Sequence, residues 1–198
     1  MKILLVGASG VLGTAVAAEL GARHDIIRAG RSGADIALDI TDAGSIRAAF
    51  EKLGTVDAVV SAAGKVKFAP LAAMSAADYG IGIADKLMGQ VNLVLIGRAH
   101  LSERGSFTLT SGVLSHDPIV AGSSASMVNG AIDSFVRAAA IELAPKRINA
   151  VSPGVLTESM EGYGPFFRGH EPVPAARAAL AFSKSVEGAL TGQVFSVL

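Results

Sequence analysis

The chain has 198 residues, 51% of them hydrophobic, which is enough to bury the core of one domain. Its 17 basic and 17 acidic residues give a formal net charge of +0 without any Lys/Arg cluster, so we expect no nucleic-acid partner. No uncharged apolar run reaches about 18 residues, which argues against a membrane span, and the absence of cysteine excludes disulfides and thiolate metal sites and is compatible with a cytoplasmic protein.

Strand-like and helical segments alternate along the chain. The first segment, Lys2 to Val6 (KILLV), is a short apolar run that ends at a glycine, as is typical of a strand buried on both faces of a parallel sheet. Further strands are predicted over 25–28, 35–38, 56–60, 105–110, 147–151 and 193–197. Helices are predicted over 11–20, from an N-cap at Thr41 to Lys52, over 75–101, over 123–143 and up to Ser185. The alternation predicts a Rossmann-like α/β fold, a doubly wound parallel β-sheet flanked by helices, as a single domain over residues 1–198.

Three glycines, Gly7, Gly10 and Gly13, follow the first strand and open the first helix. In this position the first glycine permits a sharp turn, the second lets the backbone approach a pyrophosphate, and the third lets helix and strand pack closely. The loop therefore predicts a dinucleotide site built from Gly7, Ser9, Gly10, Val11, Leu12 and Gly13. A tight turn without a ligand is the alternative, and residues 1–20 also carry traits of a secretory signal peptide, which three glycines within the apolar run disfavour.

The end of the second strand indicates which dinucleotide binds. An acidic residue there would bind a ribose 2′-hydroxyl, whereas a basic residue would pair with a 2′-phosphate. This chain has Arg31 followed by Ser32, a guanidinium and a hydroxyl that can both donate to phosphate. We therefore expect NADP(H) in preference to NAD(H), with a solvated loop arginine as the alternative.

Several later segments, together with the glycine loop, resemble the motifs of the short-chain dehydrogenase/reductase family. They are LDIT (38–41), SAAG (61–64), ELAP (142–145) and RINAVSPG (147–154). The resemblance runs over nearly the whole chain and implies an NADP(H)-dependent oxidoreductase that transfers a hydride between the cofactor and a small carbonyl or alcohol substrate. It also implies cofactor contacts from Asp39, Ile40, Ala62, Ala63, Gly64, Lys86, Pro153, Gly154 and Val155.

The chain departs from this family at its catalytic motif. The family uses a Ser, a Tyr-x-x-x-Lys and an Asn, in which Tyr exchanges a proton with the carbonyl oxygen, Lys lowers the Tyr pKa, and Ser polarises the carbonyl. Ser111 matches the Ser, but counting back from Glu142 puts Ala125 at the Tyr position and Asn129 at the Lys position. No Tyr or Lys occurs from 112 to 145, so no shift of register restores the motif.

The family's Asn position falls on Lys86, so the two residue types are exchanged between two predicted helices. We hypothesise that Lys86 supplies the positive charge near the nicotinamide ribose and that Asn129 supplies the amide. The alternative is an exposed Lys86 and a polar remnant at Asn129 in a site that has lost its chemistry.

Two groups are candidates for the missing proton donor. Tyr163 lies between glycines in a segment where the family has its substrate-covering loop, although it could equally form part of an apolar lid. A desolvated Lys86 is the second candidate. The four histidines show no ligand spacing, so we expect no metal site.

A second function fits the same residues, a non-catalytic dinucleotide-binding protein with a redox-sensing or interaction role. Both functions predict cofactor binding, and only hydride transfer distinguishes them. By resemblance to the family, we also expect a possible homodimer through the two long helices.

Overall fold

All 198 residues are described by the computed structural model, and the strands form one parallel sheet in the order β3-β2-β1-β4-β5-β6-β7. The strands are β1 (Lys2–Val6), β2 (Asp25–Gly30), β3 (Ile36–Ala37), β4 (Val56–Ser61), β5 (Leu101–Thr110), β6 (Arg147–Pro153) and β7 (Val194–Val197). The order reverses between β1 and β4, and in open α/β sheets ligands bind at the carboxyl ends of the strands beside such a reversal. The predicted fold class is confirmed.

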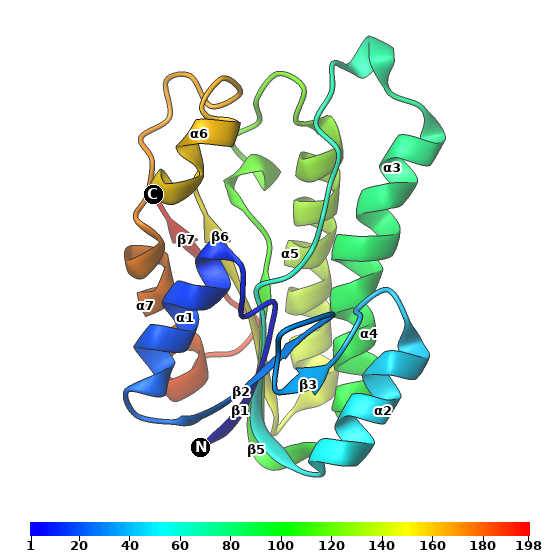
Figure 1. Cartoon of the computed structure of the whole chain (residues 1–198), viewed down its shortest axis with the longest axis vertical. Helices are drawn as coiled ribbons and strands as arrows, with labels where there is room; N and C mark the ends of the chain where they lie inside the picture. Colours follow the sequence, from blue (N-terminus) through cyan, green and yellow to red (C-terminus); the bar gives the residue numbers. More distant parts are fainter.

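Helices cover both faces of the sheet (Figure 1). On one face lie α1 (Val11–Gly21) and α7 (Ala175–Glu187), whose apolar residues pack with those of β1 and β4 in one buried cluster. The other face carries α2 (Ala43–Leu53), α4 (Met88–Gly97) and α5 (Ser123–Leu143), which enclose the larger cluster around Phe50 and Phe107. None of these helices is both long and apolar enough to cross a bilayer.

The short elements lie near the carboxyl ends of the strands. They are η1 (Leu71–Ala73), α3 (Ala76–Gly82), η2 (Ile83–Leu87), η3 (Val113–Ser115), η4 (Thr157–Ser159) and α6 (Met160–Tyr163). Figure 1 shows α6 beyond the ends of the strands, above the sheet. This end of the molecule therefore carries the loops that build a site.

The predicted N-cap at Thr41 is wrong. Helix α2 begins one residue later, and the Asp42 side chain accepts a hydrogen bond of 2.7 Å from the Gly44 N–H. The Thr41 hydroxyl instead donates to Asp39 Oδ1 at 2.7 Å, so it is not available to cap the helix.

The continuous helix predicted over 75–101 is also wrong. The segment divides into α3, the π-helical turn η2 and α4, it ends at Gly97, and Leu101 begins β5. Glycines let α4 pack closely, because a Cβ at Gly97 would lie 2.6 Å from Phe50 Cζ and one at Gly89 would lie 2.8 Å from Ile40 Cδ1. Strand β5 begins four residues before the predicted Gly105, and the other predicted boundaries agree with the structure to within about two residues.

Candidate active site

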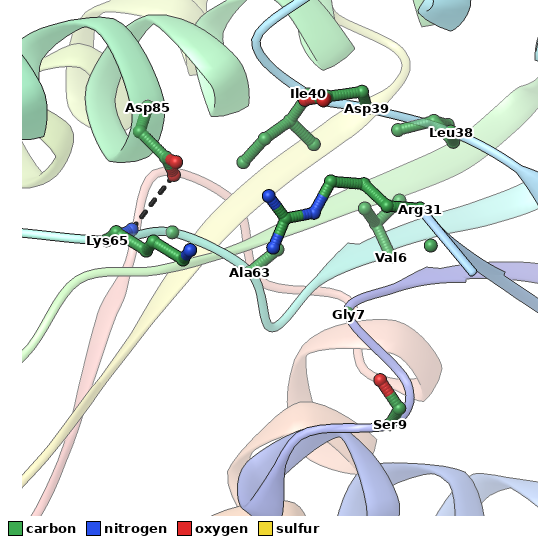
Figure 2. Close-up of a pocket in the computed structure, with 12 residues that line it drawn as sticks. Val6, Gly7, Ser9, Arg31, Leu38, Asp39, Ile40, Ala63, Lys65 and Asp85 are labelled. Atoms are coloured by element: carbon green, nitrogen blue, oxygen red, sulfur yellow. Dashed lines mark hydrogen bonds between the residues drawn. The ribbon is translucent and has the colours of Figure 1, made fainter. Parts of the chain in front are cut away.

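A cavity of about 150 Å³ lies at the carboxyl ends of β1 and β4. Figure 2 shows the Arg31 and Lys65 side chains projecting into it from opposite sides. Its lining is Val6, Gly7, Ser9, Gly30, Arg31, Leu38, Asp39, Ile40, Ala63, Gly64, Lys65 and Asp85. Seven of the predicted cofactor contacts lie in this one cavity: Gly7, Ser9, Arg31, Asp39, Ile40, Ala63 and Gly64.

The glycine loop is fixed by close backbone packing. Gly7 has a positive φ of 82°, and a Cβ there would lie 2.9 Å from the Ala62 carbonyl. A Cβ at Gly13 would lie 2.0 Å from the Gly7 carbonyl oxygen, so both positions accept only glycine. Six predicted contacts line neither this cavity nor the second one described below; they are Gly10, Val11, Leu12, Gly13, Ser32 and Ala62.

Asp39 is held as a carboxylate at the edge of this cavity. It accepts hydrogen bonds from the Thr41 hydroxyl at 2.7 Å and from the Thr41 N–H at 2.9 Å. These bonds, assisted by the positive charges of Arg31 and Lys65, hold the pKa of Asp39 below its usual value. Asp39 is therefore ionised near neutral pH.

A second cavity, of about 540 Å³, opens beyond Gly64 and Lys65. It collects the four predicted catalytic residues, Ser111, Lys86, Asn129 and Tyr163, together with the predicted contacts Pro153, Gly154 and Val155. Ala125, where the sequence predicts the position of the family's tyrosine, lines the same cavity and is 3% exposed. The structure thus brings together residues that are far apart in the sequence.

Lys86 and Asn129 are in direct contact. Lys86 Nζ donates to Asn129 Oδ1 at 2.7 Å and to the Ser111 carbonyl oxygen at 2.7 Å. Gly112 makes room for this contact, because a Cβ there would lie 2.8 Å from Asn129 Nδ2. The ammonium therefore links the π-helical turn η2, the end of β5 and helix α5.

Burial lowers the pKa of Lys86 to about 8, and the negative charge of Asp133 opposes this change. Asp133 lies one turn after Asn129 on α5, is 5% exposed, and its Oδ1 has no hydrogen-bond partner. A lysine with such a pKa is an ammonium near neutral pH and loses its proton in mildly alkaline solution.

Gln90, on α4, holds the segment that carries Lys86 against strand β5. Its side-chain amide donates to the Thr110 carbonyl oxygen at 2.9 Å and to the Lys86 carbonyl oxygen at 3.2 Å, and its oxygen accepts from the Thr110 N–H at 2.8 Å. These bonds fix η2 and α4 to the end of β5, directly before Ser111.

The Ser111 hydroxyl is buried and has no hydrogen-bond partner. A buried hydroxyl without a partner is costly in a folded protein. Because Ser111 lines the second cavity, its hydroxyl is available to a ligand there.

Tyr163 reaches the cavity from α6 and is 44% exposed. Its ring packs edge-on against Phe68, with ring centroids 5.6 Å apart, and Phe68 also contacts Phe166 at 5.7 Å. The phenol is thus part of a partly exposed aromatic group at the mouth of the cavity.

Four residues of this region were not among the predicted site residues; they are Lys65, Asp85, Gln90 and Asp133. Lys65 directly follows the SAAG segment, and this adjacency to a predicted cofactor contact could have indicated it. The other three have no local signal, because their roles depend on contacts across the fold.

Comparisons with known proteins find related oxidoreductases. The family model for short-chain dehydrogenases that is described as "Enoyl-(Acyl carrier protein) reductase" matches residues 7–197. Versicolorin reductase 1 of Dothistroma septosporum is 31% identical over 192 residues, which cover 80% of this chain and 71% of that protein. An uncharacterised oxidoreductase of Mycobacterium bovis is 30% identical over 189 residues, covering 83% of this chain and 76% of that protein.

Solved structures are similar over the whole length. The crystal structure of the protein lin1944 from Listeria innocua is 50% identical, with a TM-score of 0.98 and 100% of both chains covered. A small-chain dehydrogenase in complex with NADPH is 25% identical, with a TM-score of 0.86, and the match covers 100% of this chain and 96% of that one. A family model that spans almost the entire chain, together with the versicolorin reductase relative, shows that this chain belongs to the short-chain dehydrogenase/reductase family of oxidoreductases.

Proposed function

We propose that the protein is an NADP(H)-dependent oxidoreductase that transfers a hydride between the cofactor and a small carbonyl or alcohol substrate, with altered acid/base residues. The observation that carries this proposal is the contact of Lys86 with Asn129 and Ser111 in one cavity that adjoins the glycine-loop cavity. This contact keeps one cation and one amide at the place where the family has Lys and Asn.

The residues present fit a dinucleotide. The glycine loop forms a cradle that a Cβ at Gly7 or Gly13 would fill, and it leads into the N-terminus of α1, which favours phosphate. Arg31 offers a guanidinium for a 2′-phosphate, which supports NADP(H) over NAD(H). A relative that is 25% identical has been crystallised with NADPH.

When bound, the nicotinamide ring would supply the hydride acceptor or donor. The Ser111 hydroxyl, which is free of other hydrogen bonds, would donate to the substrate carbonyl oxygen and polarise it. The Lys86 ammonium would provide the positive charge that the family obtains from α5, and Asn129 would orient it through the bond of 2.7 Å.

The proton of the new hydroxyl would come from Lys86 or Tyr163. Lys86 has two acceptors in the structure and a pKa of about 8, so it holds a proton near neutral pH and can release it. Tyr163 lines the same cavity from the short helix α6, so its phenol can meet a substrate there.

Measurements of turnover test Lys86 and Tyr163 as proton donors. We expect the wild-type protein to oxidise NADPH in the presence of at least one member of a panel of small aldehydes and ketones, followed by absorbance. Ser111→Ala should lower kcat by about a hundredfold. Of Lys86→Met and Tyr163→Phe, the variant that removes the proton donor should lower kcat by about a hundredfold or more.

Lys86→Arg is the matched control for charge, because arginine keeps the cation but does not release a proton near neutral pH. If Lys86→Met leaves both NADPH affinity and turnover unchanged, Lys86 does not replace the family's lysine. Tight NADPH binding without turnover on any carbonyl would favour the non-catalytic dinucleotide-binding function. The observation that supports this second function is the alanine at position 125.

We further propose that the chain forms a homodimer in the cytoplasm through α4 and α5. These helices expose large apolar side chains on the face turned away from the sheet: Met88, Leu95, Met127 and Ile141. Exposed apolar residues are typical of subunit contacts where they form one patch.

A further inference from the structure

The glycine-loop cavity and the Lys86 cavity share two lining residues, Gly64 and Lys65. A dinucleotide that occupies both cavities must pass Gly64 and Lys65. The diphosphate is the middle part of a dinucleotide, so it is the part that would lie beside these two residues. Gly64 has no side chain, so Lys65 is the charged group at this passage.

Lys65 extends its ammonium into the glycine-loop cavity, facing the Arg31 guanidinium and lying across the cavity from Gly7 and Ser9 (Figure 2). The close ion pairs of the protein involve other cations, and Lys65 and Arg31 act on the Asp39 carboxylate only over a longer distance. An ammonium without a close carboxylate partner favours an anion beside it, and the Arg31 guanidinium on the opposite side of the cavity does so separately.

The two carboxylates that line this cavity are engaged with the chain itself. Asp39 accepts from the Thr41 hydroxyl and N–H, and Asp85 Oδ1 accepts from the Lys65 N–H at 2.9 Å. The bond from Asp85 holds the Lys65 backbone in place and leaves the ammonium free.

The helical turn η2 determines the positions of both Lys65 and Lys86. Gly64 has a φ of 141°, and a Cβ there would lie 2.5 Å from Lys86 Cγ, so the Gly64–Lys65 turn packs tightly on η2. Asp85 on η2 orients Lys65, and the next residue, Lys86, points into the second cavity.

We propose that Lys65 binds the diphosphate of the cofactor, across the cavity from the glycine loop. This inference rests on the proposed cofactor and adds a residue to its site. Because the diphosphate is common to NADPH and NADH, Lys65 strengthens the binding of both, whereas Arg31 strengthens the binding of NADPH alone.

Isothermal titration of the full-length protein with NADPH and with NADH tests this assignment. Lys65→Ala should weaken the affinity for both cofactors by a similar factor of about ten, as expected for one hydrogen bond to a charged group. Arg31→Ala should weaken NADPH binding and spare NADH binding. Lys67→Ala is the matched control, because Lys67 lies on the same segment, pairs with Asp78 and lines neither cavity.

Titration with ADP and AMP, which differ by one phosphate, gives a second measurement. The wild-type protein should bind ADP more tightly than AMP, and Lys65→Ala should reduce this difference while Lys67→Ala keeps it. Unchanged affinities in Lys65→Ala, or a loss confined to NADPH, would overturn the diphosphate assignment. If the wild-type protein binds neither NADPH nor NADH, the proposed cofactor is wrong and this inference falls with it.

Discussion

At the scale of single residues, the half-buried and partly desolvated ammonium of Lys86 is the most unusual feature of the site. Burial makes its charged form costly, and Asn129, the Ser111 carbonyl and the charge of Asp133 offset only part of that cost. A charge retained under these conditions is better explained by a role in binding or catalysis than by stability.

The lowered pKa of Lys86 predicts how stability depends on pH. In the folded protein Lys86 loses its proton near pH 8, whereas in the unfolded chain it keeps it to about 10.5, so the unfolded state binds more protons between these values. The stability of the wild-type protein relative to Lys86→Met should therefore rise by about 2 kcal/mol between about pH 7 and about pH 10. Urea unfolding of both proteins across this range measures the difference.

Asp133→Asn provides the control for this interpretation. Removing the negative charge should lower the Lys86 pKa further, so the rise in stability should begin at a lower pH than in the wild-type protein. A wild-type curve that runs parallel to the Lys86→Met curve over the whole range would show that Lys86 is not desolvated in the folded state.

At the scale of elements, the placement of α4 depends on its glycines and on Gln90. Gly97 lets the helix approach the Phe50 ring on α2, and Gln90 bonds it to the end of β5. The same helix follows η2, a π-helical turn, and such turns are frequent at functional sites. The position of Lys86 is thus set by packing along the whole of α4.

Gly97→Ala is expected to destabilise the fold, although alanine has the higher helix propensity. Its Cβ would lie 2.6 Å from Phe50 Cζ, and relieving such an overlap in a packed core costs about 1–3 kcal/mol. Gly80→Ala in α3 is the matched control, because no atom lies within 4 Å of its Cβ, and this change should be neutral or stabilising. Thermal unfolding of the two variants would refute the packing argument if both were equally stable.

At the scale of the whole molecule, the site occupies one end of the sheet and leaves the outer faces of α4 and α5 free. Figure 1 shows these helices on the face opposite α1 and α7. Ile141 is 82% exposed and Leu95 is 51% exposed on this outer face. Water contact with such side chains is unfavourable, which is the physical reason to expect association.

Sedimentation should therefore give a mass of twice the 20.0 kDa of one chain. Leu95→Glu and Ile141→Glu should shift the protein to the monomer, because each places a charge in the proposed contact. Leu180→Glu is the control, since Leu180 is also exposed but lies on α7, on the other face of the sheet. A monomeric wild-type protein, or a dimer that survives both substitutions, would exclude this interface.

The sequence by itself determined the fold class, and it predicted the glycine-loop site and a departure from the family's catalytic motif. These features are local: the buried strand before Gly7, the spacing of the glycines and the absence of Tyr and Lys from 112 to 145 can each be read within one short segment. The nearness of Lys86 to Asn129 could be proposed only by aligning both with family positions.

Only the tertiary structure decided how the site is assembled. The bond between Lys86 and Asn129 joins residues 43 positions apart, and the bond between Lys65 and Asp85 joins residues 20 positions apart. The close packing of α4 against Ile40 and Phe50 likewise joins residues that are far apart in the sequence. Hydrophobic periodicity reports which face of a segment is buried but not which distant residue meets it, so these contacts appear only when the chain is folded.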